Sequence, residues 1–374
     1  MPVVGVIGAG QLARMMQPAA IALGIGIKVF GEAEGSSAHQ AVTKIGDYND
    51  YEQLLEFAKT VDVITFDHEH VPTAVLERLT AEGYSVRPGP NALKHAQNKL
   101  TMRRKLTELG LPQPIWQAAK TETEVAQFLE SHGPKIVVKT PIGGYDGKGV
   151  RVIAAVSEVS DWLFNIDAFG GELLLEEKVE FSGELAQLSA RRPSGEFRAW
   201  PLVSTFQQAG VCSEVVAPAP KTSRHSEAEQ IARTVAEGLG VSGVMAVELF
   251  ELPSGEILVN ELAMRPHNSG HFSIDASITS QFEQHLRAVL DLPLGDTSST
   301  SSYAVMINLL GVDSENDFVR HYPIAMDKFP QVKFHLYEKA PRQGRKMGHL
   351  TLQGENLNEL LAAGKACREL LYNR

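Results

Sequence analysis

The sequence predicts a multidomain protein of mixed α/β and α+β class, in which an open parallel sheet is followed by strand-rich domains. The chain has 374 residues, more than one ordinary hydrophobic core accommodates, so we expect two or three domains. Up to about residue 90, apolar strands alternate with helical segments, which is typical of an open parallel sheet. Beyond residue 110, turns separate neighbouring strands, which indicates hairpins.

The N-terminal segment supplies the alternating elements. "VVGVIG" is apolar throughout, as expected of a buried strand, and Gly24 ends the helix that follows it. Pro72 opens a later helix, because proline is favoured in the first helical turn. In order, we expect a strand at 3–8, a helix at 11–24, a strand at 25–31, a helix and a strand within 51–67, and a helix at 72–83.

The rest of the chain is predicted to contain more strands than helices. The turn "PSG" joins two apolar strands and predicts a hairpin, whereas "LPLGDTSSTSS" at 292–302 has the composition of a linker. In order, we expect a helix at 91–110, a strand at 135–140, two strands within 172–192, strands at 243–252 and 255–265, a helix at 277–291, strands near 303–310, 333–337 and 347–352, and a final helix near 356–372.

Composition excludes several classes of protein. The net charge of −10 leaves no basic excess for phosphate neutralisation, so we expect no nucleic-acid partner. No apolar run approaches the roughly 20 residues of a membrane span, and the N-terminus lacks the basic region of a signal peptide, which predicts a cytoplasmic protein without a membrane partner. Cys212 and Cys367 have no neighbouring ligands at metal-binding spacing and are expected to be reduced structural thiols.

A glycine-rich loop, "KTPIGGYDGKGV", follows the strand at 135–140. Its glycines expose backbone N–H groups and allow close approach to an anion, while Lys139 and Lys148 add positive charge, so the loop favours a polyphosphate ligand. It lacks the P-loop pattern, and a plain hairpin loop is the alternative.

Two acids interrupt the otherwise apolar strands of the predicted hairpin. Glu248 and Glu261 would repel each other across the hairpin unless a cation lay between them, and Asn260 precedes the second acid. Mg²⁺ prefers oxygen ligands and commonly uses one or two carboxylates together with substrate phosphates. The pair therefore predicts Mg²⁺ (or Mn²⁺) bridging phosphates; two structural ion pairs are the alternative.

Two basic loops and one histidine-containing loop complete the candidate segments. "RPHNSGHFS" at 265–273 follows the predicted metal strand directly, and its arginine can hold a carboxylate or bicarbonate. "EKAPRQGRKMGH" at 338–349 concentrates cations in an acidic protein and favours a phosphate; a solvated turn is the alternative in each case. "FDHEHVP" at 66–72 carries His68 and His70 but no third metal ligand, so we expect a strand-end loop near a ligand crevice.

The N-terminal stretch "GVIGAGQLARMM" has the glycine spacing of a dinucleotide-binding turn. Gly8, Gly10 and Ala13 are followed by Glu32 at about the distance of the ribose-binding acid in such folds. An NAD(P)-dependent oxidoreductase is therefore an alternative from a different class. Glycine turns at helix N-termini hold anions in general, however, and a dinucleotide is only one of them.

Taken in order, these stretches resemble the ATP-grasp superfamily and, more closely, the 5-(carboxyamino)imidazole ribonucleotide synthases of purine biosynthesis. The resemblance covers nearly the whole chain and rests on "GQLARMM", "GGYDGKG", "FSGE", "GVMAVE", "NELAMRPHNSGH", "AVMINLLG" and "GRKMGH". It implies a Rossmann-like N-terminal domain over 1–95, an ATP-grasp domain over 96–295 with a mobile lid at about 117–180, and a small β-rich C-terminal domain over 300–374. It also implies a homodimer.

The resemblance implies an ATP-dependent ligase. ATP phosphorylates bicarbonate to carboxyphosphate, and the exocyclic amine of 5-aminoimidazole ribonucleotide captures this anhydride, or CO₂ released from it. ADP and phosphate then leave. Since carboxyphosphate hydrolyses quickly in water, a lid must exclude solvent while fixed cations offset the gathered negative charge.

The resemblance also implies roles for individual residues. Glu248 and Glu261 match metal ligands, and Arg265, Lys339 and Glu261 match catalytic positions, with Arg265 expected to stabilise carboxyphosphate. The positions that match ATP contacts are Lys99, Lys139, Gly144, Tyr145, Asp146, Gly147, Lys148, Gly149, Val150, Glu176, Glu177, Lys178, Val179, Glu184, Gln207, Asn260 and Glu261. Those that match ribonucleotide contacts are Gly10, Gln11, Leu12, Tyr145, Asp146, Arg265, His267, Asn268, Lys339 and Arg345.

In this assignment the glycine turn binds the substrate rather than a dinucleotide. We expect the N–H groups of Gly10, Gln11 and Leu12 near the 5′-phosphate, with Lys339 and Arg345 closing on it from the C-terminal domain.

Several departures from the family pattern leave alternatives open. Gln207 replaces a nucleotide-side histidine, Lys148 stands where many relatives have arginine, and Asp67 is shorter than the expected glutamate. Other ATP-grasp ligases, such as formate-dependent glycinamide ribonucleotide transformylase or biotin carboxylase, share the ATP machinery and differ at the basic loops. A catalytically silent nucleotide-binding regulator is a third possibility, against which the intact acid pair argues.

Overall fold

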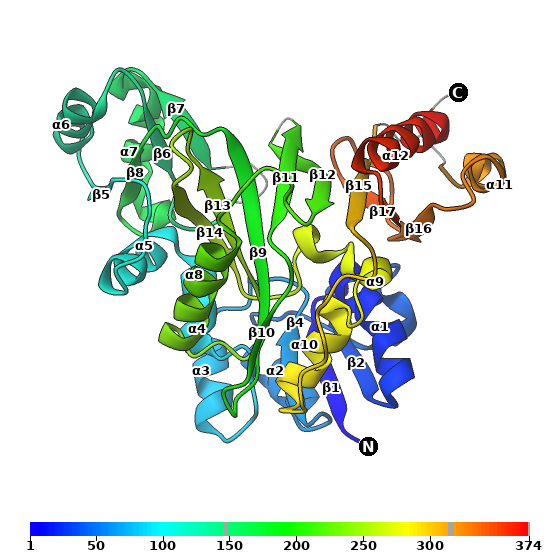
Figure 1. The fold of residues 1–374 in the computed structure, drawn as a ribbon. Helices are drawn as coiled ribbons and strands as arrows, with labels where there is room; N and C mark the ends of the chain where they lie inside the picture. The colour runs from blue at the N-terminus through cyan, green and yellow to red at the C-terminus, as the bar shows by residue number, and fades with distance from the viewer. Residues whose placement is uncertain (145–148, 209, 313–317, 373–374) are drawn as a thin grey trace.

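The computed structural model describes residues 1–144, 149–208, 210–312 and 318–372 and arranges them around three sheets (Figure 1). The predicted Tyr145, Asp146, Gly147 and Lys148 lie outside the described residues. Within these ranges, no helix combines the length and the apolar content that a membrane span requires.

The N-terminal sheet is parallel and confirms the predicted alternation of strands and helices. Its order is β3-β2-β1-β4, with Val4 of β1 opposite Ile27 on one side and Val63 on the other. The elements are β1 Val3–Ile7, α1 Gln11–Leu23, β2 Gly26–Gly31, β3 Val42–Ile45, α2 Tyr51–Ala58, β4 Val63–Phe66, α3 Thr73–Ala81 and α4 Pro90–Gln97. Gly24 ends α1 in the left-handed conformation, as predicted.

A small antiparallel sheet forms the upper left of the molecule in Figure 1, over the region expected to be the lid. Its order is β5-β8-β6-β7, and two helices cover it. The elements are β5 Trp116–Ala119, α6 Glu122–His132, β6 Ile136–Lys139, β7 Val150–Ile153, α7 Ser160–Phe164 and β8 Leu173–Glu177.

The third sheet is the largest and runs from the centre of the molecule to its C-terminal end. Its order is β14-β13-β9-β11-β12-β15-β17-β16, with β10 paired to β9. The strands are β9 Gly183–Arg191, β10 Phe197–Ala199, β11 Val203–Gln208, β12 Val211–Ala217, β13 Gly243–Glu251, β14 Ile257–Ala263, β15 Tyr303–Leu310, β16 Lys333–Leu336 and β17 Lys346–Gly354. Since β12 pairs with β15, the C-terminal strands extend the central sheet instead of forming a separate one.

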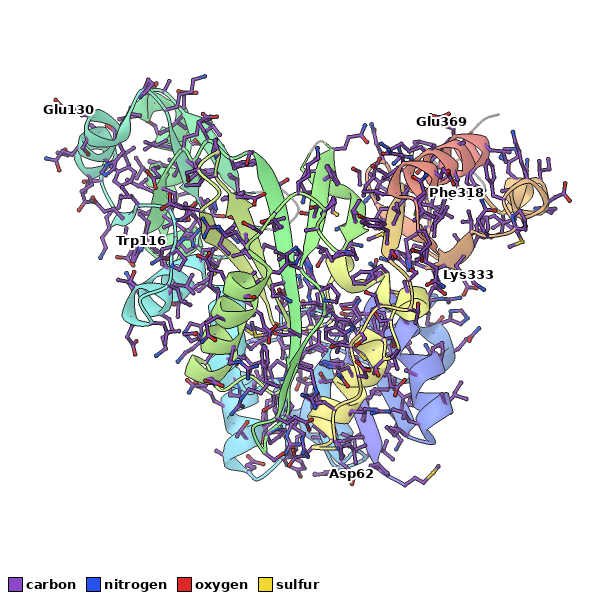
Figure 2. The ribbon with its side chains drawn as sticks, in the orientation of Figure 1. Asp62, Trp116, Glu130, Phe318, Lys333 and Glu369 are labelled. Atoms are coloured by element: carbon purple, nitrogen blue, oxygen red, sulfur yellow. The ribbon has the colours of Figure 1, made fainter. Side chains whose placement is uncertain are left out.

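Several helices surround this sheet. They are α5 Lys99–Glu108, α8 His225–Gly238, α9 Ser273–Ala276, α10 Gln281–Val289, α11 Phe318–Lys328 and α12 Leu357–Tyr372. One of them, α10, packs against α1 of the N-terminal domain. Phe282 and Leu286 of α10 pack in one buried cluster with Met16 and Ala20 of α1. Side chains fill the space between the central and N-terminal sheets (Figure 2), so the two domains share a core.

Two predicted helices differ from the observed ones because of capping. The helix expected at 91–110 is two helices, since Asn98 is extended and its side chain accepts the Thr101 N–H as the N-cap of α5. The helix expected from 277 begins at Gln281, where Ser280 accepts the Glu283 N–H. In the part of the chain that the structure describes, no disulfide joins Cys212 to Cys367.

Candidate active site

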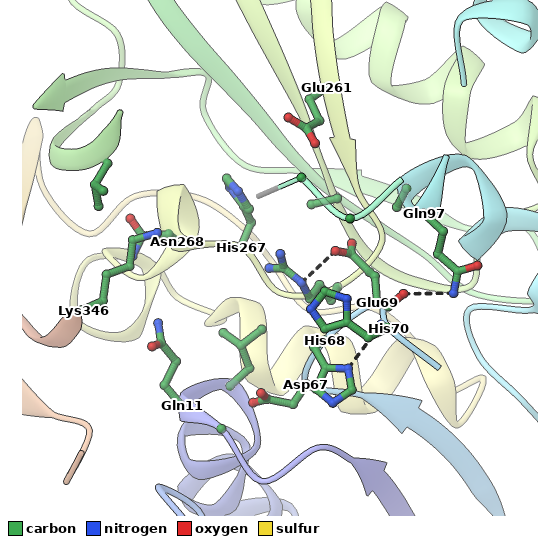
Figure 3. Close-up of a pocket in the computed structure, with 18 of the residues that line it drawn as sticks. Gln11, Asp67, His68, Glu69, His70, Gln97, Glu261, His267, Asn268 and Lys346 are labelled. Carbon is green, nitrogen blue, oxygen red and sulfur yellow. Dashed lines mark hydrogen bonds and ion pairs between the residues drawn. The ribbon is translucent and has the colours of Figure 1, made fainter. Parts of the chain in front are cut away.

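Two cavities meet at the end of the β13–β14 hairpin. The first, of about 1010 Å³, lies between the N-terminal domain, the hairpin and the C-terminal loop at 339–346 (Figure 3). The second, of about 610 Å³, lies between the small antiparallel sheet and the central sheet. The residues that line both cavities are Lys99, Glu248, Glu261, His267, Asn268 and Lys346. Two of these are lysines and two are acids, which concentrates ionic chemistry at the junction.

The predicted acid pair lies at this junction. Glu248 of β13 is directly opposite Glu261 of β14, and the register shifts immediately after this pair, so that Asn260 is the extra residue of a β-bulge. His267 Nε2 lies 3.0 Å from a Glu248 oxygen, and Lys99 Nζ lies 3.2 Å from Glu261. Burial opposes ionisation of Glu248, but the hydrogen bond and charge of His267 hold its pKa below 4.5.

The acids and Asn260 fit a hard divalent cation by their chemistry. Two carboxylates and an amide oxygen are the donors that Mg²⁺ or Mn²⁺ prefers. In the described part of the chain, no three His, Cys, Asp or Glu side chains gather closely enough to hold a metal by themselves. Such an ion would therefore need further ligands from bound phosphates, which is how Mg²⁺ is commonly held.

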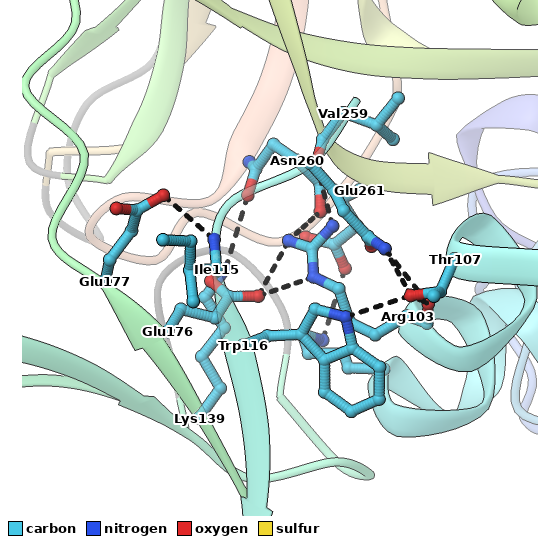
Figure 4. A network of polar contacts seen from close by, with 12 residues as sticks. Arg103, Thr107, Ile115, Trp116, Lys139, Glu176, Glu177, Val259, Asn260 and Glu261 are labelled. Carbon is cyan, nitrogen blue, oxygen red and sulfur yellow. Dashed lines mark hydrogen bonds and ion pairs between the residues drawn. The ribbon is translucent and has the colours of Figure 1, made fainter. Parts of the chain in front are cut away.

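A buried ionic network supports the side of the junction that faces the second cavity (Figure 4). Glu176 of β8 accepts hydrogen bonds from Arg103 and Lys139, both at 2.7 Å. The Arg103 guanidinium also donates to the carbonyl oxygens of Val259 and Asn260, at 2.8 and 2.9 Å. Burial raises the pKa of Glu176, but the two cations outweigh it and lower the pKa to about 2. Glu176 therefore stays ionised and holds Lys139 at the cavity wall.

Most of the predicted ATP contacts line the second cavity. They are Lys99, Lys139, Val150, Glu176, Glu177, Lys178, Val179, Glu184, Gln207, Asn260 and Glu261. Gly144 lines the first cavity instead, and Gly149 lines neither. Gly149 has a positive φ of 73° and leaves no room for a Cβ against Thr140, so glycine is required there. Burial, followed by the charge of Glu248, raises the pKa of Glu184 to about 7.

The described residues predicted to contact the ribonucleotide come together in the first cavity. Its lining includes Gly10, Gln11, Leu12, Arg265, His267, Asn268, Lys339 and Arg345. Lys339 Nζ donates to Gln11 Oε1 at 2.6 Å, so the C-terminal loop meets the start of α1 directly. The N–H groups of the first helical turn have no intrahelical acceptor, which leaves an anion-binding end at this wall.

The glycine turn is covered by the end of β4 rather than open to a dinucleotide. Asp67 accepts the Ala13 N–H at 2.8 Å and lies so close to Gly10 that a Cβ would collide with its carboxylate. A Cβ at Gly8 would lie 2.6 Å from the His68 ring, and His68 Nε2 bonds Glu32 at 2.7 Å. The carboxylate occupies part of the helix terminus that a pyrophosphate would use, which argues against the oxidoreductase alternative.

Sequence reasoning missed three residues that support the site, namely Glu69, Gln97 and Arg103. Glu69 accepts the Met264 N–H at 2.7 Å and Arg265 Nε at 3.2 Å, and thereby joins the strand-end loop to the basic loop. Gln97 fixes this loop by donating to the carbonyl of Glu69 at 2.9 Å. Glu69 lies between His68 and His70, and this position in a histidine-containing loop could have marked it as a candidate site residue. Arg103 gave none, because it adjoins a second arginine in a basic helix.

Comparisons with known proteins agree with this arrangement. Residues 1–97 match the ribonucleotide synthetase preATP-grasp domain, 104–282 the ATP-grasp domain, and 304–363 the phosphoribosylaminoimidazole carboxylase C-terminal domain. The chain is 45% identical over 367 residues to the N5-carboxyaminoimidazole ribonucleotide synthase of Mycobacterium tuberculosis, covering 96% of this chain and 85% of that protein. It is 44% identical over 382 residues to the Corynebacterium ammoniagenes enzyme of the same name, covering 100% and 92%.

Solved structures show the same likeness over the full chain. The N5-carboxyaminoimidazole ribonucleotide synthetase of Thermus thermophilus has a TM-score of 0.87 at 32% identity and covers 99% of each chain. The Aspergillus clavatus enzyme, solved with ADP and 5-aminoimidazole ribonucleotide, has a TM-score of 0.88 at 30% identity, with 99% of this chain and 98% of that one covered.

Proposed function

The chain belongs to the N5-carboxyaminoimidazole ribonucleotide synthase family of ATP-grasp ligases, and we propose how its two cavities divide the reaction. It is an ATP-dependent ligase of purine biosynthesis. In the proposal, ATP occupies the second cavity and 5-aminoimidazole ribonucleotide the first. The observation that supports this division is the junction, where one set of ionic side chains lines both cavities. An intermediate formed there reaches its acceptor without entering bulk water.

In the second cavity, lysine side chains bind the phosphates of ATP and backbone groups bind its adenine. Lys99 and Lys139 hold the phosphates, and the buried Glu176 keeps Lys139 in place. Backbone groups of residues 176–179, at the end of β8, bind the adenine, and the Glu184 side chain binds the ribose. Gln207 stands on the same wall and donates or accepts one hydrogen bond where relatives use histidine.

Glu248, Glu261 and Asn260 would hold Mg²⁺ or Mn²⁺ against the ATP phosphates. When bound, the ion neutralises charge on the transferring phosphoryl group. The chain's own residues supply the rest of the neutralisation: Lys99 already neighbours Glu261, and His267 neighbours Glu248.

In the first cavity, the 5′-phosphate lies between the start of α1 and the C-terminal loop. The N–H groups of Gln11 and Leu12 face it from α1, and Lys339 and Arg345 face it from the C-terminal loop. Gly10 makes room for Asp67, whose carboxylate lies where a Cβ would be. Because Asp67 already accepts the Ala13 N–H, we place the phosphate on the outer part of the helix terminus.

At the junction, bicarbonate attacks the γ-phosphorus of ATP and ADP leaves. The amine of the ribonucleotide then attacks the carboxyl carbon of carboxyphosphate, or CO₂ released from it, and phosphate leaves. Arg265 offers its guanidinium to the developing anion, while Glu69 fixes its orientation through Nε. His267 and Asn268 complete the wall.

Turnover assays with alternative acceptors test the proposal. We expect ADP release with MgATP and bicarbonate to be stimulated by 5-aminoimidazole ribonucleotide, and not by formate with glycinamide ribonucleotide or by biotin. Absence of stimulation by aminoimidazole ribonucleotide would refute the proposal. A thermal shift with NAD(P) and none with MgATP would instead support the oxidoreductase. We also propose that the protein is cytoplasmic and forms a homodimer. Sedimentation velocity tests the dimer.

A further inference from the structure

Asn268 stands at the junction of the two cavities, and its amide is held by a residue outside both. Asn308 of β15 is buried and lines neither cavity. Asn268 Nδ2 donates to Asn308 Oδ1 at 3.1 Å, and Asn308 Nδ2 donates to Asn268 Oδ1 at 2.7 Å. The two amides thus form a reciprocal pair that joins the basic loop to the C-terminal part of the sheet.

A third contact determines which way round this pair is arranged. Asn308 Nδ2 also donates to the Cys212 carbonyl oxygen at 2.8 Å. A carbonyl can only accept, so the Asn308 NH₂ group must face Cys212. Asn308 Nδ2 then uses one hydrogen for Cys212 and the other for Asn268 Oδ1. The orientation of Asn268 is therefore dictated from β12, one strand away, and not by local preference.

The pair uses one of the two hydrogens on Asn268 Nδ2. If Asn268 were flipped, its Nδ2 would meet the Asn308 Nδ2, and two buried donors would face each other without an acceptor. The buried environment therefore makes the flipped state costly. Asn268 is the member of the pair that lines both cavities, so its remaining N–H is the polar hydrogen available to a ligand there.

We propose that Asn308 is a positioning residue that fixes the Asn268 amide so that it offers an N–H donor, and not a carbonyl oxygen, to the anionic oxygens at the cavity junction. The inference rests on the proposed function, in which phosphoryl and carboxyl oxygens gather at this point. A fixed donor stabilises such oxygens without reorganising during the reaction, whereas a carbonyl dipole would repel them.

A double-mutant cycle tests the proposal. Wild-type enzyme is first assayed for ADP release stimulated by 5-aminoimidazole ribonucleotide. Absence of stimulation refutes the proposed function, whereas the effects of the variants on the active enzyme test the role of Asn308. With active wild type, we expect Asn308→Ala to lower kcat roughly 10-fold, as other residues that orient a ligating group do, with little change in KM for ATP. In an Asn268→Ala background, Asn308→Ala should lower kcat no further, because it acts through Asn268.

Tyr372→Phe is the matched control. Its hydroxyl bonds the N–H and the carbonyl of Leu310 on the same strand, at 2.7 and 2.8 Å, so its loss weakens β15 without touching Asn268. We expect Tyr372→Phe to be less stable than the wild type and to have the same kcat. If Asn308→Ala does not fold, Asn308→Leu replaces it, because leucine has nearly the shape of asparagine and fills the same space but cannot hydrogen-bond Asn268. A wild-type kcat in the folded variant, or losses from Asn268→Ala and Asn308→Ala that multiply, would overturn the proposal.

Discussion

Replacing Glu176 with glutamine would test whether the buried ionic network stabilises the protein. The side chain keeps its size but loses its charge, which leaves the fully buried Arg103 and the adjacent Lys139 without an anion. The pKa of Glu176 lies at about 2 instead of 4.5, and this difference corresponds to about 3 kcal/mol of stability at neutral pH. Breaking a buried pair by removing one partner generally costs about 3–5 kcal/mol, which agrees.

Urea unfolding at pH 7 measures the loss directly. Because the folded-state pKa is lowered, the contribution is fully present above pH 4.5 and declines as the pH falls toward 2. The difference between wild type and Glu176→Gln should therefore be the same at pH 7 and pH 6. Glu172→Gln is the control: it breaks the more exposed pair with Arg104, at 2.8 Å, and should cost less than about 1 kcal/mol. A Glu176→Gln variant within about 1 kcal/mol of wild type would refute the reasoning.

Three further predictions concern the proposed metal ligands, acid stability and the proposed substrate loop. Glu261→Gln should abolish turnover with the fold intact by circular dichroism, and near-normal activity would contradict its role as a metal ligand. Burial lowers the pKa of His271 and His349 well below 6.5 and that of His285 to about 3, so the unfolded state alone gains their protons below pH 6.5. Stability by urea unfolding should fall by about 4 kcal/mol from pH 7.5 to 5.5 through these three groups, and His285→Gln should make the decline shallower; an unchanged slope would contradict this. Lys339→Ala should raise KM for 5-aminoimidazole ribonucleotide at least 10-fold and leave KM for ATP nearly unchanged, whereas equal effects on both would contradict its placement.

The parts of the site that depend on local pattern were predictable from the sequence. The hairpin is one case: its short turn brings Glu248 opposite Glu261, as its two acid-interrupted strands indicated. Arg265, Lys339 and Arg345 of the first cavity are another case, because each sits in a segment of unusual composition.

The supporting residues were not predictable, because their role depends on packing between distant segments. Arg103 and Arg104 look alike in sequence, yet the first is buried between β8 and β14 and the second is exposed. Asn308 meets Asn268 across 40 residues of chain, and no local spacing signals that pairing. The N-cap at Asn98 was in principle readable, since asparagine favours that position, but the helical pattern on both sides concealed it.

The pairing of β12 with β15 has a consequence for how the protein is made. Glu214 lies opposite Ile307, so the edge of β12 is covered only once the chain beyond residue 302 has been synthesised. A nascent or truncated chain ending before that point would carry an open strand edge, a template for pairing with other chains. The C-terminal segment thus covers the edge of the central sheet, and the chain cannot be shortened before β15 without exposing that edge.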